Sequence, residues 1–431
     1  MVIKFYLETY GCSLNASDSE VIAGRLEAID AVRVNNERDA NLIVVNTCGV
    51  KEPTEDKIIH RLRELADEVR PVIVAGCLPK ISYHRIELAI PRFAAMIGPQ
   101  SIESLGAIVP QVLAGARGIN ALEPEGASKL QWFHGPPDSV ICTVPICEGC
   151  LGNCAYCAVK FARGHVKSHS IEDISRIVTR CIHTGYREIR LTSQDAGVFG
   201  VDTGESLVDL IKALDQIEGR HRFRLGMFNP NLVLESIDSL VDAMSSEHYF
   251  QFYHVPLQSG SDAVLQAMGR RYTVAQWEAV VSAIRSKRPS ATIATDIIVG
   301  YPGETDQDFE ETMNTIERMK LPVVNISKYG DRPGTLASKS PRKVDTLVKK
   351  NRSRALSRLV DDIVLETNHS WIGWSGPVLV TERGSRGGWL ARNPAYKLVI
   401  MNGDYSPGSI LDVQITDGKK THLIGEVRSL V

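Results

Sequence analysis

The sequence lacks any long uninterrupted run of apolar residues, and its N-terminus, MVIKFYLETYG, has no charged segment leading into an apolar one. A membrane-spanning helix needs about 20 predominantly apolar residues, and a secretory signal needs both segments, so we expect neither. Charge of one sign is not in excess either. The formal net charge of −2 argues against a protein that attracts nucleic acid over its whole surface. These absences predict a cytoplasmic protein without a membrane anchor, in which any nucleic-acid surface is local.

The chain of 431 residues is too long for one hydrophobic core, so we expect two or three domains. Residues 1–117 alternate apolar runs such as NLIVVNT with amphipathic runs such as SDSEVIAGRLEAI, which predicts a Rossmann-like parallel sheet with helices. Ser17 or Asp18 is the expected N-cap of the first helix. Residues 118–139 contain several glycines and prolines and are predicted to form a linker.

The alternation continues through residues 140–371, with strand-like runs such as REIRLTS and TIATDIIVG. Repeated βα units predict a full or partial α/β barrel, whose chemistry would lie at the C-terminal ends of the strands. Residues 340–371 indicate one long basic helix. Residues 372–431 consist of short runs separated by glycine or Asn/Asp turns, which is typical of a small antiparallel β-barrel. The predicted fold class is therefore α/β with a C-terminal barrel.

Four of the nine cysteines are gathered in the loop sequence ICEGCLGNCAYC. Cys150, Cys154 and Cys157 form the pattern C-x3-C-x2-C, and thiolates this close together can converge on one iron–sulfur cluster. Three protein ligands on four irons leave one iron open to a reacting molecule, as in catalytic zinc sites. A structural zinc site is an alternative, as is a closed electron-transfer cluster with Cys147 as its fourth ligand.

Three other cysteines each follow an apolar, strand-like run: Cys12, Cys48 and Cys77. Because the carboxyl ends of parallel strands meet at one edge of a sheet, these thiols are predicted to lie close together and to hold a second cluster with an open iron. The alternative is three buried cysteines that act as small apolar residues. Cys142 and Cys181 fit neither group and are expected in the core.

The loop C-x3-C-x-Y-C resembles the radical S-adenosylmethionine superfamily. The segments TYGCSLNASDSE, VVNTCGVKEPTEDK and VAGCLPK further resemble its methylthiotransferases, over essentially the whole chain. The resemblance implies two [4Fe–4S] clusters. One, on Cys150, Cys154 and Cys157, would cleave S-adenosylmethionine, and an auxiliary one would carry sulfur on the N-terminal cysteines.

The resemblance also implies the reaction. The segments GCSLNASDSE, LTSQDAG and RLGMFNP are most similar to the archaeal and eukaryotic branch, which inserts a methylthio group at C2 of N6-threonylcarbamoyladenosine beside the tRNA anticodon. Alternatives within the family are isopentenyladenosine in tRNA and an aspartate of a ribosomal protein. An iron–sulfur electron carrier without catalysis is a third hypothesis. The implied partners are tRNA through its anticodon loop, an electron donor such as a ferredoxin or flavodoxin, and a sulfur source.

Several polar or small residues near the loop and the strand ends are expected to contact the cofactor. Tyr156 is placed to lie against its adenine, and Arg163 to pair with its carboxylate. Core packing, turn formation and a solvated charge are the alternatives for these residues. Arg332 is a candidate substrate contact. The expected cofactor contacts are Tyr156, Arg163, Gln194, Asp195, Asn229 and Gly300.

Residues 372–431 resemble the TRAM domain, a small barrel that binds RNA in tRNA-modifying enzymes. Trp389 or Tyr396 is a candidate for stacking on a base. For each charged residue, the alternative is an ordinary solvated surface position. The residues expected to contact RNA phosphates are Arg383, Arg386, Arg392 and Lys397.

Overall fold

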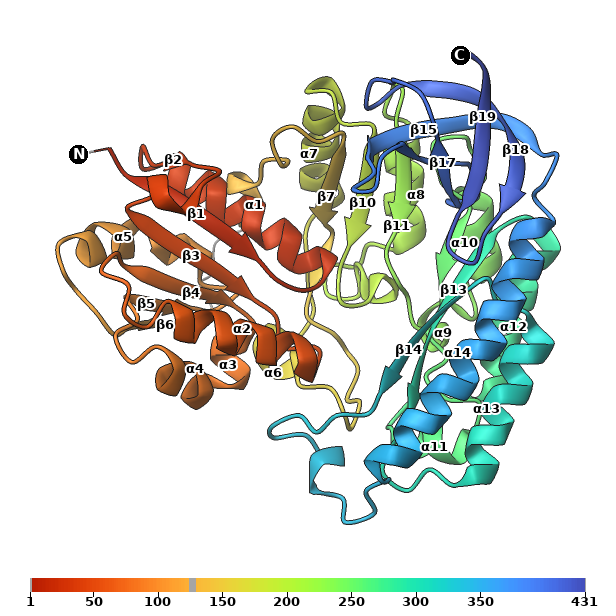
Figure 1. Ribbon diagram of the computed structural model, residues 1–431, viewed down its shortest axis with the longest axis horizontal. Coiled ribbons are helices and arrows are strands. Elements are labelled where there is room, and N and C mark those ends of the chain that lie inside the picture. The colour runs from red at the N-terminus through yellow and green to blue at the C-terminus, as the bar shows by residue number, and fades with distance from the viewer. Residues whose placement is uncertain (1, 124–128, 431) are drawn as a thin grey trace.

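The computed structural model describes residues 2–123 and 129–430, and Figure 1 shows the arrangement of its elements. The N-terminal lobe is a parallel sheet in the order β2-β1-β3-β4-β5-β6. Every residue of β3 and β4 is buried, as expected for central parallel strands covered on both faces. The strands are β1 (Lys4–Thr9), β2 (Val32–Arg33), β3 (Leu42–Thr47), β4 (Val72–Gly76), β5 (Ala95–Ile97) and β6 (Ile119–Ala121).

Helices cover both faces of this sheet, and they define two different cores. Successive side chains of a strand point to opposite faces: Val44 packs into a core shared with α1 and the central domain, and Val45 packs into a separate core with α2. The N-terminal lobe and the central domain are thus joined by continuous apolar packing. The helices are α1 (Ser13–Glu27), α2 (Glu52–Glu64), α3 (Leu78–Ile81), α4 (Tyr83–Ala89) and α5 (Leu105–Leu113).

One local prediction in this lobe is wrong, and the predicted linker contains short elements. The helix α1 has Cys12 as its N-cap, not Ser17 or Asp18, because the chain turns at Gly11 (φ +112°) and enters the helix directly. The predicted linker 118–139 contains β6 and the 3-10 helix η3 (Lys129–Trp132), which contacts α1. Its part at 124–128 lies outside the described residues.

The central domain is an open barrel of parallel strands, as predicted. The sheets β11-β10-β7 and β12-β13-β14 contain only parallel pairs. A single parallel bridge joins Phe223 of β11 to Tyr249, which precedes β12 in the chain. The strands are β7 (Ile141–Pro145), β10 (Glu188–Thr192), β11 (Arg222–Leu225), β12 (Phe252–His254), β13 (Thr292–Val299) and β14 (Val323–Lys328), with the short pair β8 (Cys147–Glu148) and β9 (Lys167–Ser168).

Helices follow these strands along the outside of the open barrel, and Figure 1 shows α12, α13 and α14 side by side along one edge. The helix α14 begins six residues later than predicted, because the side chain of Asp345 caps it at the backbone N–H of Leu347. The helices are α6 (Val159–Arg163), α7 (Ile171–His183), α8 (Leu207–Asp215), α9 (Pro230–Val233), α10 (Ile237–Ala243), α11 (Asp262–Ala267), α12 (Val274–Lys287), α13 (Asp306–Met319) and α14 (Thr346–His369).

The C-terminal region forms a closed barrel in the order β15-β16-β17-β19-β18. Its pairs are antiparallel except β17 with β19, which is parallel, so the predicted wholly antiparallel barrel is correct in all but this pair. In the part of the chain that the structure describes, no helix combines the length and apolar character required to cross a bilayer. The strands are β15 (Ser375–Arg383), β16 (Trp389–Arg392), β17 (Leu398–Met401), β18 (Ile410–Gly418) and β19 (Leu423–Leu430).

Candidate functional site

The three N-terminal cysteines lie at the carboxyl ends of adjacent strands. Cys12 follows β1, Cys48 follows β3 and Cys77 follows β4. The side-chain oxygen of Asn15 lies 3.9 Å from the sulfur of Cys12 and 3.8 Å from that of Cys77, and the sulfur of Cys48 lies 2.5 Å from the position of a Cβ added to Gly11, the residue before Cys12. The structure therefore brings together three thiols that are far apart in the sequence.

The turn before Cys12 requires glycine. A Cβ atom on Gly11 would lie 2.3 Å from the Cβ of Cys48, and the φ of +112° is one that other residues rarely adopt. The hydrogen bond from Cys48 lowers the pKa of Cys12 to about 6, and it raises the pKa of Cys48. One member of the pair is thus poised to be a thiolate, the form that binds metal.

This donor set fits an iron–sulfur cluster better than a single ion. Sulfur-only ligands select soft metals and iron–sulfur clusters. A cluster of four irons is larger than a single ion and is bound by thiolates that lie further apart. The ligand roles of Cys12, Cys48 and Cys77 remain a prediction that this arrangement supports.

The second cysteine group lies on the loop between β8 and α6. The backbone N–H of Gly152 donates to the sulfur of Cys150 (3.1 Å), and a Cβ on Gly152 would lie 3.2 Å from that sulfur and 3.5 Å from the sulfur of Cys154. Two thiols thus flank a glycine that leaves room between them. Burial raises the pKa of Cys150 to about 11 and also raises that of Cys157, so a bound cation is needed to hold these sulfurs as thiolates at neutral pH.

The remaining cysteines are interior. Cys147 is fully buried and its thiol points to the backbone oxygen of Asp195 (3.7 Å), which favours leaving it out of the ligand set. Cys142 and Cys181 are buried with their sulfurs 2.9 Å apart. Their predicted place in the core is confirmed.

Three of the expected cofactor contacts form one polar network beside this loop. Arg270 joins them: it donates to the hydroxyl of Tyr156 (2.6 Å) and to the side-chain oxygen of Asn229 (2.8 Å). The amide of Asn229 in turn donates to Asp195 (2.6 Å). The network spans the cysteine loop and the ends of β10 and β11, so it fixes the loop relative to the strand ends.

Asp195 is held as a buried acceptor. It receives hydrogen bonds from the backbone N–H groups of Gly197 and Asn229 as well, while burial raises its pKa. The neighbouring Gln194 has a buried side-chain oxygen with no hydrogen-bond partner within the described ranges, so it is free to accept from a ligand. Arg270 was missed from the sequence, where the pair of arginines directly after a helix in MGRRYT was the available signal.

Arg163 and Gly300 have other surroundings. Arg163 is 1% exposed and donates to the sulfur of Cys77 (3.2 Å), beside the N-terminal cysteines. The backbone N–H of Gly300 donates to Glu304 (2.6 Å), and a Cβ there would clash with Lys349 at 2.1 Å. Contacts of these two residues with the cofactor remain predictions.

Arg332, a candidate substrate contact, is buried and already engaged. It donates to the backbone oxygen of Gly49 (2.8 Å) and pairs with Glu55 (2.5 Å). It therefore holds the loop that follows Cys48 against the central domain.

The chain matches three family models: uncharacterized protein family UPF0004 over residues 4–98, the radical SAM superfamily over 144–316 and the TRAM domain over 376–427. It is 38% identical over 428 residues to the probable threonylcarbamoyladenosine tRNA methylthiotransferase of Pyrococcus horikoshii, covering 99% of this chain and 100% of that protein. The Homo sapiens threonylcarbamoyladenosine tRNA methylthiotransferase is 34% identical over 433 residues, covering 98% of this chain and 74% of that protein. The chain belongs to the threonylcarbamoyladenosine tRNA methylthiotransferase family.

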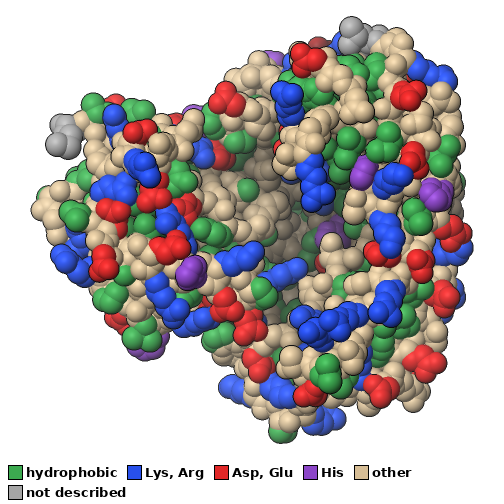
Figure 2. All heavy atoms as spheres, viewed as in Figure 1, with side chains coloured by type: hydrophobic (Ala, Val, Ile, Leu, Met, Phe, Trp, Pro, Cys, Tyr) green, Lys and Arg blue, Asp and Glu red, His purple; other side chains and the backbone are tan. Residues whose placement is uncertain are grey.

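A solved structure supports the fold of this methylthiotransferase family member. The radical S-adenosylmethionine methyltransferase TsrM from Kitasatospora setae superposes with a TM-score of 0.56 at 13% sequence identity, over 78% of this chain and 74% of that one. At this identity the likeness concerns the fold alone. The methylthiotransferase is hollowed between its N-terminal lobe and the central domain, with Lys and Arg side chains along the hollow (Figure 2).

The predicted RNA contacts of the methylthiotransferase differ in availability. Arg383 and Arg386 are exposed. Lys397 is 8% exposed and donates to the side-chain oxygen of Asn368 (2.9 Å), so its ammonium is buried and hydrogen-bonded within the protein. Arg392 lies over the ring of Tyr396, 4.6 Å from its centroid.

The two candidate stacking residues of the barrel are both packed. Trp389 belongs to the barrel core. Tyr396 contacts Phe250 and Phe252, and its hydroxyl donates to Glu188 (2.5 Å). Both rings are thus packed against neighbouring side chains, and stacking of either on a base remains a prediction.

Proposed function

We propose that this protein inserts a methylthio group at C2 of N6-threonylcarbamoyladenosine beside the tRNA anticodon, using two [4Fe–4S] clusters. Sequence similarity along nearly the whole of this chain to proteins named for this activity carries the proposal. The two separate cysteine groups on facing parts of the fold support it, since sulfur insertion into a C–H bond needs both a radical source and a sulfur carrier.

Each cluster would be held by three thiolates. Cys150, Cys154 and Cys157 would hold one, and the N-terminal group Cys12, Cys48 and Cys77 the other. When bound, such clusters with S-adenosylmethionine supply an electron for reductive bond cleavage and an open iron for a small ligand. The donor sets fit this role, because each leaves a fourth position to a ligand from outside the chain.

The chain's own residues would orient the cofactor. Tyr156, Arg270, Asn229 and Asp195 lock one another by hydrogen bonds, so the groups lining the cysteine loop are held in place before ligand binds. Preorganised dipoles of this kind need no rearrangement during the reaction. Gln194 would supply a further acceptor from the end of β10.

The partners follow from the same proposal. The tRNA anticodon loop would enter the hollow of Figure 2, while Arg383 and Arg386 contact phosphates elsewhere on the molecule. An electron donor such as a ferredoxin or flavodoxin and a sulfur source complete the requirements. A cytoplasmic location stays a prediction from the sequence.

The test is nucleoside analysis of tRNA treated with the enzyme. Anaerobically reconstituted protein, S-adenosylmethionine and a reductant are incubated with tRNA that carries N6-threonylcarbamoyladenosine. Mass spectrometry of the digested tRNA should show the methylthio nucleoside. A matched reaction with tRNA carrying isopentenyladenosine should show no methylthio product. Modification of that tRNA alone would contradict the substrate assignment.

A further inference from the structure

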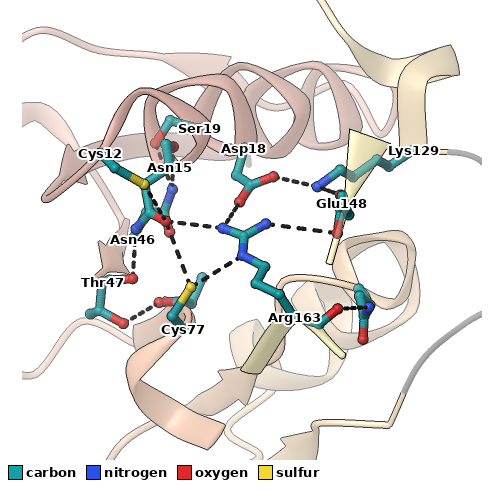
Figure 3. Close-up of polar contacts among 12 residues, drawn as sticks. Cys12, Asn15, Asp18, Ser19, Asn46, Thr47, Cys77, Lys129, Glu148 and Arg163 are labelled. Carbon is teal, nitrogen blue, oxygen red and sulfur yellow. Dashed lines mark hydrogen bonds and ion pairs between the residues drawn. The ribbon is translucent and has the colours of Figure 1, made fainter. Parts of the chain in front are cut away.

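The guanidinium of Arg163 lies at the centre of a buried polar cluster that links the two cysteine groups. Arg163 is the last residue of α6, six positions after Cys157. Its side chain nevertheless reaches the N-terminal lobe, where it donates to the sulfur of Cys77 (3.2 Å) and to the side-chain oxygen of Asn15 (3.0 Å). Figure 3 shows the guanidinium between these residues and Asp18.

The cluster is electrically balanced. Asp18 pairs with both Arg163 and Lys129, and Lys129 also pairs with Glu148. Two buried cations thus meet two buried anions, which is the condition under which charges are tolerated in an interior. Asp18 and Arg163 are each 1% exposed. Because both side chains are enclosed by the protein, their ion pair fixes the position of the guanidinium.

One donor of the guanidinium is directed at sulfur. A carboxylate and an amide oxygen accept from Nη2, whereas Nε faces Cys77. Arginine is a fixed fork of donors that never loses its proton in proteins, so this N–H···S contact persists at any working pH. Hydrogen bonds to cysteine sulfurs are among the factors that set the reduction potential of an iron–sulfur cluster.

We propose that Arg163 is a positioning residue of the auxiliary site: its guanidinium, clamped by Asp18 and Asn15, donates to the Cys77 sulfur and raises the reduction potential of a cluster bound there. The inference rests on the proposed function, which places that cluster on Cys12, Cys48 and Cys77. A positive charge and a donated hydrogen bond both stabilise the more negative, reduced form of the cluster.

The test uses the full chain with Cys150, Cys154 and Cys157 replaced by alanine, so that only the N-terminal cysteines can bind iron. After anaerobic reconstitution, this parent should contain about four irons per chain. A redox titration followed by electron paramagnetic resonance then compares Arg163→Met and Arg163→Lys with the parent. The matched control is Arg176→Met, because Arg176 is an exposed arginine on α7 whose side chain is 68% exposed.

Arg163→Met should lower the potential, Arg163→Lys should restore part of it, and Arg176→Met should match the parent. An Arg163→Met potential equal to that of the parent would overturn the inference. A parent that binds no iron would instead overturn the auxiliary site itself, together with this inference, while Arg163 is still present.

A second measurement does not depend on the variants folding. The parent is labelled with 15N-arginine, and the reduced cluster is studied by pulsed electron paramagnetic resonance. A 15N coupling that is absent from unlabelled protein and retained in labelled Arg176→Met is expected from the N–H···S contact. A labelled parent without that coupling would contradict the contact.

Discussion

Asp18 carries a negative charge in the protein interior, and its surroundings explain why that charge is stable. Burial works to raise its pKa, but the charges of Arg163 and Lys129 outweigh burial and lower it. Because the folded-state pKa lies below the unfolded one, this pairing stabilises the fold above about pH 3.9. The contribution is lost as the pH falls through the folded-state pKa.

Asp18→Asn should therefore lower the free energy of unfolding by about 3–5 kcal/mol at pH 7, because it leaves the buried guanidinium of Arg163 without its nearest carboxylate. Urea denaturation measures the change, which should shrink in acid. The control is Asp173→Asn, since Asp173 pairs with Arg176 at the surface and should contribute less than about 1 kcal/mol. Equal midpoints for the two variants would contradict the buried pairing.

Cys154→Ala should abolish formation of the methylthio nucleoside but leave the N-terminal cluster, since the two cysteine groups are separate. Iron analysis after anaerobic reconstitution should fall to about half, from two four-iron clusters to one. Cys147→Ala is the comparison, because the thiol of Cys147 points into the core. Complete loss of iron from Cys154→Ala would show that the sites depend on each other.

Among the elements, the turn between β1 and α1 is the most constrained at the N-terminal cysteines. Gly11→Ala would place a Cβ 2.3 Å from the Cβ of Cys48 in a backbone conformation that disfavours alanine. The variant should lose the N-terminal cluster while retaining the one on the loop at 150–157. Iron analysis and the spectrum of the remaining cluster check this.

Gly115→Ala is the matched control for that turn. Gly115 has a similar φ of +104°, but nothing lies within 4 Å of a Cβ added there. Both variants carry the backbone strain, and only Gly11→Ala adds the collision. Equal iron content in the two variants would show that the close approach to Cys48 is not needed.

Strand ends were predictable because hydrophobic runs and the geometry of parallel sheets are local properties that the sequence displays. That is why the convergence of Cys12, Cys48 and Cys77 followed from their positions. Asp18 was assigned to a helix N-cap and Arg163 to the cofactor, because short polar side chains and arginines have plausible local roles everywhere. Their actual pairing spans 145 positions in the sequence, and only tertiary packing brings them together.

At the scale of the whole molecule, the barrel docks on the central domain through groups that looked like RNA contacts. Tyr396 was expected at a base because aromatic and basic residues lie together in its segment. The structure instead uses it, with Phe250 and Phe252, to seal an interface. Sequence reasoning could not separate these outcomes, because both require an aromatic residue on the barrel surface.

Lys397 at this interface makes stability depend on pH. Burial lowers its pKa from 10.5 to about 8. Between those values the unfolded chain binds more protons, so folded-state stability contributed by this residue rises with pH. Lys397→Met should raise the thermal midpoint of unfolding at pH 7. It should also remove the rise in stability that Lys397 contributes between pH 8 and 10. If the difference in thermal midpoint between the wild type and the variant did not depend on pH, the burial of the charge would be contradicted.

The exposed arginines of the barrel give a prediction for RNA affinity. Replacing both Arg383 and Arg386 with alanine should weaken tRNA binding and reduce the slope of log affinity against log salt by about 1.4, if each meets one phosphate of unpaired RNA. Fluorescence anisotropy at several salt concentrations measures the slope. The double variant of the exposed Arg176 and Arg318 should leave the slope unchanged.

The apolar core that runs without interruption from α1 into the central strands has a consequence for turnover. Rotating the lobe as a unit would expose this shared core to water, so we expect the lobe to stay fixed on the central domain. If the two cysteine groups hold the proposed clusters, we expect the distance between those clusters to change little during turnover. The motions of the proposed reaction would then be those of the ligands: the nucleotide would flip in, and the products would diffuse out.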